Sequence, residues 1–266
     1  MRLDKELVER DLAPTRSKAQ ELITREKVEV NGKVITKLSF DVNVSDKIVI
    51  KENDLLKYVS RAGLKLEKAI KVFNIDFYNK NVMDIGSSTG GFTDCAVQNG
   101  AASVIAVDVG TNLMVDSLRN NPKVTLFEQT NIKDLPSKYF KDVDITVIDV
   151  SFVSLSKIFE KIFREQIKVD IMALIKPQFE CGKQIADKFK GVISSPTVHK
   201  QVIEDVISMA RDFGFTLNNL DFSAIKGGDG NIEYISHFTN RDFHSTLNDK
   251  VINIDLIIKN AFNSLK

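Results

Sequence analysis

The first fifty or so residues carry short amphipathic runs separated by turns. Thr15 precedes a run with helical spacing, and its hydroxyl suits the N-cap position of a helix. Asn31-Gly32 lies between two short stretches of alternating apolar and polar residues, a pattern typical of a β-hairpin turn. These features indicate a small α+β module. We expect helices over 4–10 and 15–23 and strands over 28–30, 33–35 and 42–50.

After a polar stretch at 51–54 the apolar runs become longer and regularly spaced. A helix is expected first, over 59–73, with Leu66, Ala69 and Ile70 on one face. Apolar strands then alternate with amphipathic segments, which predicts an α/β fold: a Rossmann-like, seven-stranded, mainly parallel sheet with helices on both faces. The last two strands leave no room for a helix between them and should form an antiparallel hairpin at one edge. The expected strands lie at 82–85, 104–108, 124–127, 145–150, 169–175, 215–224 and 232–238.

This change of pattern predicts two domains, at 1–53 and 59–266, joined by a linker at 54–58. The larger domain is long enough to bury a core of its own. A further helix is expected from about His244 onward. His199 follows Pro196 near an expected helix start, so we expect it at the surface or in a capping position.

A turn rich in glycine and hydroxyl residues follows the first strand of the larger domain. That strand ends in Asp84, and glycines without a Cβ let a ligand approach main-chain N–H groups at the start of the next helix. Asp108 ends the following strand, where doubly wound folds place a carboxylate that binds a ribose. The pattern therefore predicts a nucleoside-cofactor site, with Asn131 close to the base. The candidate cofactor-binding residues are Asp84, Gly86, Ser88, Gly90, Gly91, Phe92, Asp108 and Asn131.

The spacing of this turn favours one class of cofactor. A dinucleotide fingerprint needs three glycines at G-x-G-x-x-G, but Ser88 occupies the second of these positions. Asp84 would repel a pyrophosphate and suits a ligand with a cationic end. S-adenosylmethionine carries an ammonium and a sulfonium, so we expect it in preference to NAD(P). A turn that binds no ligand is the alternative, but it does not explain two acids at successive strand ends.

The overall charge excludes little, because 37 Lys and Arg residues balance 36 Asp and Glu residues. The two cysteines are too few for a disulfide framework or a structural zinc site, so we expect no metal and a cytoplasmic location. No apolar run is long enough for a signal peptide or a membrane span. A basic cluster in the small module could bind phosphates, although interleaved acids also suit a solvated face. The cluster comprises Arg16, Lys18, Arg25, Lys27 and Lys33.

Charged residues also recur at strand ends of the larger domain, where ligands bind in open α/β sheets. Asp149 and Lys176 each close an apolar run, and Glu233 opens the last strand. Lys65 lies on the helix before the first strand. Each could instead be an ordinary exposed charge, and for Lys65 this alternative is strengthened by two further lysines on the same helix.

Several sequence strings together carry a family resemblance. In the small module, 15–23 and 28–32 resemble an S4 RNA-binding domain. Five further strings occur in order: Ser60-Arg61-Ala62-Gly63-Leu64-Lys65-Leu66, Asp84-Ile85-Gly86-Ser87-Ser88-Thr89-Gly90-Gly91-Phe92-Thr93-Asp94, Asp149-Val150-Ser151-Phe152, Lys176-Pro177-Gln178-Phe179-Glu180 and Gly230-Asn231-Ile232-Glu233-Tyr234. With them, nearly the whole chain resembles the TlyA group, also called haemolysin A. In that group an S4 domain precedes a ribose 2'-O-methyltransferase of the FtsJ/RrmJ class.

The resemblance implies S-adenosylmethionine as cofactor, ribosomal RNA or ribosomal subunits as substrate and a cytidine ribose as methyl acceptor, with no stable protein partner. It also implies that Lys65, Asp149, Lys176 and Glu233 correspond to the catalytic Lys-Asp-Lys-Glu tetrad of that class. A ribose hydroxyl is a weak nucleophile near neutral pH, so transfer requires alignment and proton removal. We expect Lys176 to orient or deprotonate it, the two acids to position the lysines, and Lys65 to stabilise negative charge.

Two other functions stay open. A non-catalytic RNA-binding protein could keep the same fold, and it would bind RNA without transferring methyl groups. A membrane-active haemolysin, which the older family name suggests, needs a spanning segment or amphipathic strands that close a barrel. The sequence offers no segment suited to either structure.

Overall fold

The computed structural model describes residues 1–13, 15–51, 57–241 and 252–265. The chain divides into two compact units, Met1–Ser60 and Arg61–Lys266. Part of the predicted linker lies outside the described residues, as does the predicted start of the last helix near His244. A C-terminal helix is present as α10 (Ile254–Ser264).

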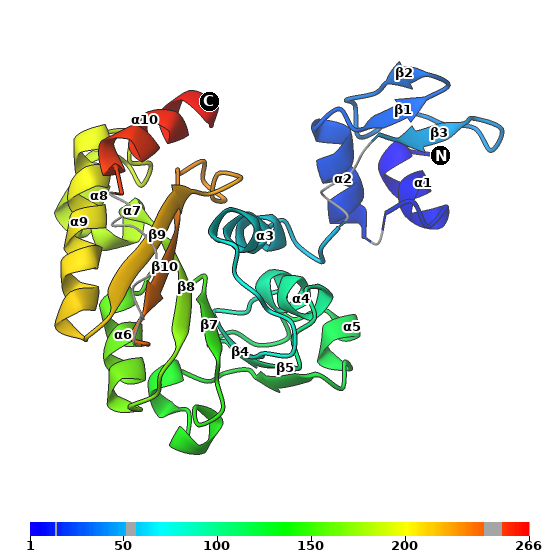
Figure 1. Ribbon diagram of the computed structural model, residues 1–266. Coiled ribbons are helices and arrows are strands. Elements are labelled where there is room, and N and C mark those ends of the chain that lie inside the picture. Colours follow the sequence, from blue (N-terminus) through cyan, green and yellow to red (C-terminus); the bar gives the residue numbers. More distant parts are fainter. Residues whose placement is uncertain (14, 52–56, 242–251, 266) are drawn as a thin grey trace. The chain divides into compact units, whose positions relative to one another are not determined.

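The small unit packs two helices and, among its described residues, a three-stranded antiparallel sheet around one core (Figure 1). Leu3, Leu7 and Leu22 are fully buried in that core. Thr15 caps the second helix as predicted, because its hydroxyl accepts a hydrogen bond from the Lys18 backbone N–H at 3.2 Å. The elements are α1 (Leu3–Glu9), α2 (Arg16–Thr24), β1 (Val28–Val30), β2 (Lys33–Val34) and β3 (Ile48–Ile50).

The strand predicted over 42–50 is shorter than expected. Its last three residues alone form β3, which pairs with β1. The preceding residues make a turn, in which the Asn43 backbone N–H donates to the Asp46 carboxylate at 2.7 Å. Val42 still packs in the core, so its apolar side chain marked burial rather than strand structure.

The larger unit is built on one sheet whose strands, within the described residues, follow the order β6-β5-β4-β7-β8-β10-β9 (Figure 1). β4 to β8 run parallel, and β10 is antiparallel to both β8 and β9. The predicted Rossmann-like α/β fold is therefore confirmed, with the antiparallel pair at one edge. The strands are β4 (Asn81–Ile85), β5 (Ser103–Val107), β6 (Val124–Phe127), β7 (Ile145–Ile148), β8 (Asp170–Ile175), β9 (Thr216–Phe222) and β10 (Tyr234–Thr239).

Helices cover both faces of this sheet (Figure 1). On one face α3 packs against α4 and β10, and on the other α6, α9 and α10 enclose a core that includes Met83, Phe159 and Phe238. None of the described helices is long and apolar enough to cross a membrane. The helices are α3 (Ala62–Phe73), α4 (Gly91–Gln98), α5 (Asp116–Arg119), α6 (Leu155–Arg164), α7 (Pro177–Glu180), α8 (Lys183–Lys188) and α9 (Pro196–Asp212), with 3-10 turns η2 (Ile132–Asp134) and η3 (Ser137–Tyr139).

His199 is fully buried, so the expectation of a surface or capping position is wrong. It lies on the inner side of α9, where its Nδ1 is 2.7 Å from the Tyr234 hydroxyl and its Nε2 is 2.9 Å from the Ile193 carbonyl oxygen. A carbonyl can only accept, so Nε2 carries the proton and Nδ1 accepts from the tyrosine. With both nitrogens satisfied the ring is buried in its neutral form, and burial lowers its pKa.

Candidate active site

Four charged side chains meet at the edge of the sheet where β7 and β8 end. The strand register aligns the carboxyl ends of β7 and β8 with the amino end of β10. Asp149 directly follows β7, Lys176 follows β8, and Glu233 precedes β10. Lys65 is added by α3, which packs against β10. The structure thus brings together all four residues predicted to form a catalytic tetrad.

The four side chains form a continuous series of ion pairs. Lys65 Nζ lies 2.6 Å from Glu233 Oε2 and 3.7 Å from Asp149 Oδ2. Lys176 Nζ lies 2.5 Å from Asp149 Oδ1 and 3.2 Å from the hydroxyl oxygen of Ser151. Both lysines and Glu233 are more than nine-tenths buried. Cations and anions therefore alternate in a largely water-excluded group.

Because the tetrad is buried, each charged side chain needs its oppositely charged neighbour to be stable there. A charge removed from water is costly unless a counter-charge and hydrogen bonds replace its hydration. Each lysine has a carboxylate within hydrogen-bonding distance, and Asp149 lies between the two ammonium groups. The ammonium groups are therefore held in place, which suits them to orient a bound hydroxyl or to stabilise negative charge as it develops.

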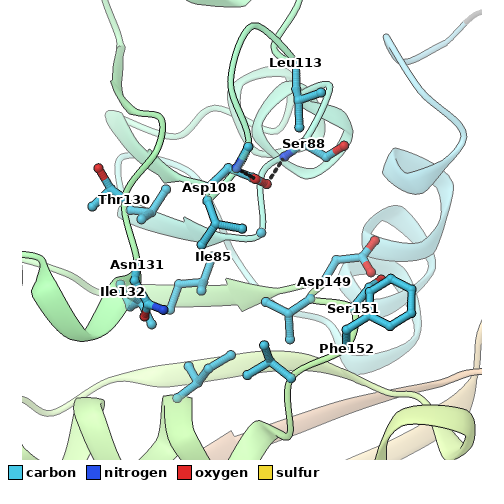
Figure 2. Close-up of a pocket in the computed structure, with 17 residues that line it drawn as sticks. Ile85, Ser88, Asp108, Leu113, Thr130, Asn131, Ile132, Asp149, Ser151 and Phe152 are labelled. Carbon is cyan, nitrogen blue, oxygen red and sulfur yellow. Dashed lines mark hydrogen bonds between the residues drawn. The ribbon is translucent and has the colours of Figure 1, made fainter.

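A cavity of about 400 Å³ opens beside the tetrad and includes Asp149 in its lining. In Figure 2, Asp149 lies beside Ser151 and Phe152 on one side of this cavity, and Thr130 and Asn131 lie on the other. Half of the predicted cofactor-binding residues line it, namely Gly86, Ser88, Asp108 and Asn131.

Asp108 is placed as expected of an acid that binds ribose. Its Oδ2 accepts from the Ser88 backbone N–H at 2.8 Å, and its Oδ1 accepts from that of Gly110 at 2.7 Å (Figure 2). Each carboxylate oxygen keeps a second acceptor position, so ribose hydroxyls can also bind. Leu113 and Ile132 add apolar lining that suits a flat base. These residues fit the nucleoside part of S-adenosylmethionine.

Gly86 lies where a side chain would clash with the backbone at Asp149. Its φ is +85°, and a Cβ there would lie 2.8 Å from the Asp149 carbonyl oxygen. An L-residue with a left-handed backbone costs about 1–2 kcal/mol. We expect Gly86→Ala to lower the free energy of unfolding by more than this, because the clash adds to that cost. We also expect its affinity for S-adenosylmethionine to fall more than about tenfold. Chemical denaturation and titration calorimetry measure the two effects.

Gly214→Ala is the matched control for this prediction. Gly214 has a φ of +76°, and nothing lies within 4 Å of the place its Cβ would take. This variant should therefore show the backbone cost alone, with unchanged affinity for the cofactor. Equal losses in the two variants would contradict the steric argument.

The other four predicted cofactor residues do not line the described cavity. Asp84 is fully buried, and its Oδ2 accepts from the Thr93 hydroxyl at 2.6 Å while its Oδ1 has no partner within the described structure. Thr93 belongs to α4, so the Asp84 side chain points toward the face of β4 that α4 covers. Gly90, Gly91 and Phe92 form the start of α4. Their roles in cofactor binding stay predictions.

Burial raises the pKa of Asp84 from 3.8 to about 7, and the nearby negative charges of Asp149 and Asp108 add to this effect. In the unfolded chain the carboxyl loses its proton near its ordinary pKa, whereas in the folded protein it keeps the proton up to about pH 7. The folded state thus binds the extra proton between about pH 4 and pH 7, and stability is lost as the pH rises through this window.

Asp84→Asn is expected to remove this pH-dependent loss. The side chain becomes neutral in both states, so the variant gains on the order of 4 kcal/mol relative to the wild type between the two ends of the window. Urea denaturation of both proteins at a series of pH values measures the difference. If the two stability curves run parallel, Asp84 does not titrate in this way.

In the small unit, a buried acid organises two arginines. Arg16 Nε lies 2.9 Å from Asp4 Oδ2, and Arg2 Nε lies 2.9 Å from Asp4 Oδ1. The hydrogen bonds from Arg2 are the main reason that the pKa of Asp4 lies well below its usual range. Arg2 was missed in the sequence, because its position before the first helix gave no signal apart from its charge.

The remaining predicted RNA-binding residues differ in exposure. Lys18 is buried and lies 3.7 Å from Glu21, which also pairs with Arg25 at 3.2 Å. Lys33 is exposed and Lys27 is half-buried, both beside the hairpin. Arg16, Arg25 and Lys33 are therefore better placed than Lys18 to reach a phosphate.

Sequence reasoning also missed Phe152 beside the tetrad. Its side chain is 89% exposed, and its φ of +62° is rare for an aromatic residue. The ring centroids of Phe152 and Phe179 lie 4.8 Å apart, and Lys176 Nζ lies 5.8 Å from the Phe179 ring. Phe152 belongs to the string Asp149-Val150-Ser151-Phe152 that carries the family resemblance, but the exposure of its ring depends on the loop conformation.

Known proteins share both units of this chain. The model of the FtsJ-like methyltransferase family matches residues 58–240, and that of the S4 domain matches residues 1–48. The 23S rRNA (cytidine-2'-O)-methyltransferase TlyA of Campylobacter jejuni is 37% identical over 87% of this chain and 96% of that protein. The 16S/23S rRNA (cytidine-2'-O)-methyltransferase TlyA of Mycobacterium tuberculosis is 36% identical over 88% of this chain and 87% of that protein.

A solved structure is similar over nearly the full length. It is that of a protein from Streptococcus thermophilus provisionally named a hemolysin, with a TM-score of 0.75 and 36% identity over 99% of this chain and 96% of that one. The match to the FtsJ-like methyltransferase family, over residues 58–240, spans the tetrad and the lining of the cavity. The chain therefore belongs to the FtsJ-like methyltransferase family, in the TlyA group that carries an S4 domain ahead of the methyltransferase domain.

Proposed function

We propose that this protein transfers a methyl group from S-adenosylmethionine to the ribose 2'-hydroxyl of a cytidine in ribosomal RNA. One observation carries the proposal: Asp149 both lines the cofactor cavity and holds Lys176 at 2.5 Å. A hydroxyl placed beside Lys176 would thus lie next to the bound cofactor. The two TlyA relatives are named as rRNA (cytidine-2'-O)-methyltransferases, which supports the same substrate.

The cofactor-binding roles follow from the lining of the cavity. Asp108 accepts hydrogen bonds from the ribose hydroxyls of the cofactor, and Asn131 lies where the adenine binds. Gly86 has no Cβ, so the chain there can pass close to the Asp149 carbonyl and keep Asp149 in the wall of the cavity. When bound, S-adenosylmethionine supplies an electrophilic methyl group.

The tetrad residues act on the ribose hydroxyl. Lys176 orients this hydroxyl and, once its own ammonium proton has passed to Asp149, takes the hydroxyl proton as a neutral amine. Lys65 neutralises the carboxylates of Asp149 and Glu233 and stabilises negative charge that develops on the attacking oxygen. Glu233 holds Lys65 in place from the start of β10.

Phe152 offers a surface for a base next to this site. An exposed aromatic ring can stack on the face of any unstacked base of an RNA strand. The ring lies at the rim of the cavity and packs on Phe179, which steadies it. We assign Phe152 to stacking on a base of the bound RNA.

The two units have different functions, RNA binding and methyl transfer. Residues 1–53 form the S4 domain, which binds the RNA backbone through Arg16, Arg25, Lys27 and Lys33, with Arg2 held beside Arg16 by Asp4. Residues 59–266 form the methyltransferase domain, and 54–58 join the two. Fixed guanidinium groups suit phosphate recognition because less side-chain entropy is lost on binding. With ribosomal RNA as its substrate, the protein would act in the cytoplasm.

Methyl transfer can be tested directly. The protein is incubated with S-adenosylmethionine labelled in the methyl group and with naked ribosomal RNA or with separate ribosomal subunits. Label in RNA, mapped to the 2'-oxygen of a cytidine, is the expected result. RNA binding without any transfer would instead support a non-catalytic RNA-binding protein, and label on a base would overturn the assignment to ribose.

A further inference from the structure

A short basic segment leaves the active site and returns to it. Residues 182–191, which we call the basic arch, follow α7 and contain α8. None of the six residues of α8 is buried, which is unusual for a helix in a globular domain. Gly182 and Gly191 at its two ends have φ values of +79° and +81°, and these left-handed residues form its bends. The conformation of the arch is therefore not stabilised by burial of the side chains of α8.

The near end of the arch is fixed beside Lys176. This residue is the N-cap of α7, whose last residue, Glu180, comes just before the arch. Glu180 accepts hydrogen bonds from the Ser154 hydroxyl and the Leu155 backbone N–H, each at 2.8 Å. Those contacts join α7 to the loop that carries Asp149, so the arch starts from a rigid part of the site.

The far end of the arch is fixed beside Glu233. Asn231 donates to the Gly191 carbonyl oxygen at 2.8 Å and accepts from the Ile193 backbone N–H at 3.0 Å. The Ile193 carbonyl is also bound by His199, which accepts from the hydroxyl of Tyr234. Asn231 and Tyr234 both lie within two residues of Glu233, so the arch returns to the tetrad.

The arch carries mainly positive charge, and its lysines do not contribute ion pairs to the described structure. Lys183, Lys188 and Lys190 are exposed, and Asp187 is the one acid among residues 182–191. Within the described structure, none of these three lysines takes part in an ion pair. Three ammonium groups are thus presented to solvent on a segment tied at both ends to the catalytic residues.

We propose that the basic arch binds RNA phosphates that flank the target nucleotide. This inference rests on the proposed function, because it requires an RNA strand to enter the tetrad. Lysine binds phosphate as a point charge, with no need for a shaped pocket, and such contacts set the position of a strand without reading its bases. The arch would thereby hold the ribose at Lys176, and its effect would be on substrate binding and not on the chemical step.

A protein partner is the competing occupant. Ile185 and Val192 are partly exposed on or beside the arch and could meet an apolar surface. The three lysines favour RNA, since charged lysines are depleted from the cores of protein interfaces. Naked RNA separates the two possibilities, because it contains no ribosomal protein.

The test replaces the three arch lysines together, as Lys183→Gln, Lys188→Gln and Lys190→Gln, in the full chain. Binding of a naked ribosomal RNA fragment is measured against salt concentration, and methyl transfer is measured in parallel. We expect the slope of log affinity against log salt to fall in magnitude by about 2, as for three lost phosphate contacts. The KM for RNA should rise about tenfold or more, with kcat and S-adenosylmethionine affinity unchanged.

Two further variants make the result specific. Changing the same three lysines to arginine keeps the charge and should restore the wild-type slope. Changing Lys138, Lys141 and Lys168 to glutamine removes the same charge from exposed positions in or near the segments that lead into β7 and β8. That control should change the slope by less than half as much as the arch variant.

The outcomes separate this inference from the proposed function. An unchanged salt slope for the arch variant overturns the inference even if the wild type methylates RNA normally. Unchanged binding to naked RNA with weaker binding to intact subunits also overturns it and indicates a protein contact. If the slope falls but even the wild type transfers no methyl group, the arch binds RNA and the proposed function is wrong.

Discussion

Lys176→Ala is expected to lower kcat for methyl transfer by about 10²- to 10⁴-fold, the range typical of losing a positioned acid or base. Lys176 Nζ is held between Asp149 Oδ1 at 2.5 Å and the Ser151 hydroxyl at 3.2 Å, at the end of the buried ion-pair series. Alanine removes the amino group that we propose contacts the attacking hydroxyl. Single-turnover transfer of labelled methyl groups to RNA measures the loss.

Lys176→Arg separates the two roles assigned to this lysine. Arginine keeps a positive charge and can orient a hydroxyl, but it does not give up its proton in proteins. A variant as inactive as alanine would therefore indicate proton transfer, whereas substantial activity would indicate orientation alone. Titration of both variants with S-adenosylmethionine is the control, and full activity of the alanine variant with normal cofactor binding would exclude Lys176 from catalysis.

The second large effect concerns stability. Lys65→Met is expected to lower the free energy of unfolding by about 3–5 kcal/mol, because it leaves a buried carboxylate without its partner. Lys65 Nζ lies 2.6 Å from Glu233 Oε2, and both side chains are almost fully buried. Methionine is apolar and has a similar length, so the main change is the loss of charge. Urea denaturation at neutral pH measures the effect.

A double variant shows whether the charge itself is responsible. Adding Glu233→Gln to Lys65→Met removes the unpaired charge and should recover part of the lost stability. Lys71→Met is the control on the same helix, because Lys71 pairs with Glu67 at 2.7 Å but its side chain is 69% exposed. A surface pair contributes about 0–1 kcal/mol. Similar losses at Lys65 and Lys71 would contradict the argument.

Much of the fold could be predicted because its signals are local. The alternation of apolar runs and amphipathic segments specified the parallel strands, and the missing helix before β10 specified the antiparallel pair. Asn31-Gly32 specified the hairpin of the small unit. The prediction over 42–50 was less accurate, because an apolar residue such as Val42 can be buried from a turn as well as from a strand.

The candidate site was predictable in part for the same reason. Asp108 and Gly86 follow from their places at strand ends, which is where an open sheet binds ligands. Asp84 lies two positions earlier in the register, inside β4, and its side chain turns toward Thr93 of α4. Successive side chains of a strand point to opposite faces, so the exact residue at which the strand ends decides whether an acid meets the ligand or a covering helix. The sequence did not specify that boundary to a single residue.

By itself, the sequence determined the order of the elements and the glycine turn, since each depends on neighbours in the chain. The four charged residues were assigned together only through the family resemblance. The tertiary structure alone decided that Lys65 meets Glu233, because the two are 168 positions apart and come together only through strand order and helix packing. It also decided that His199 is buried and that the basic arch returns to the tetrad. These features depend on long-range hydrogen bonds, whose partners no local pattern specifies.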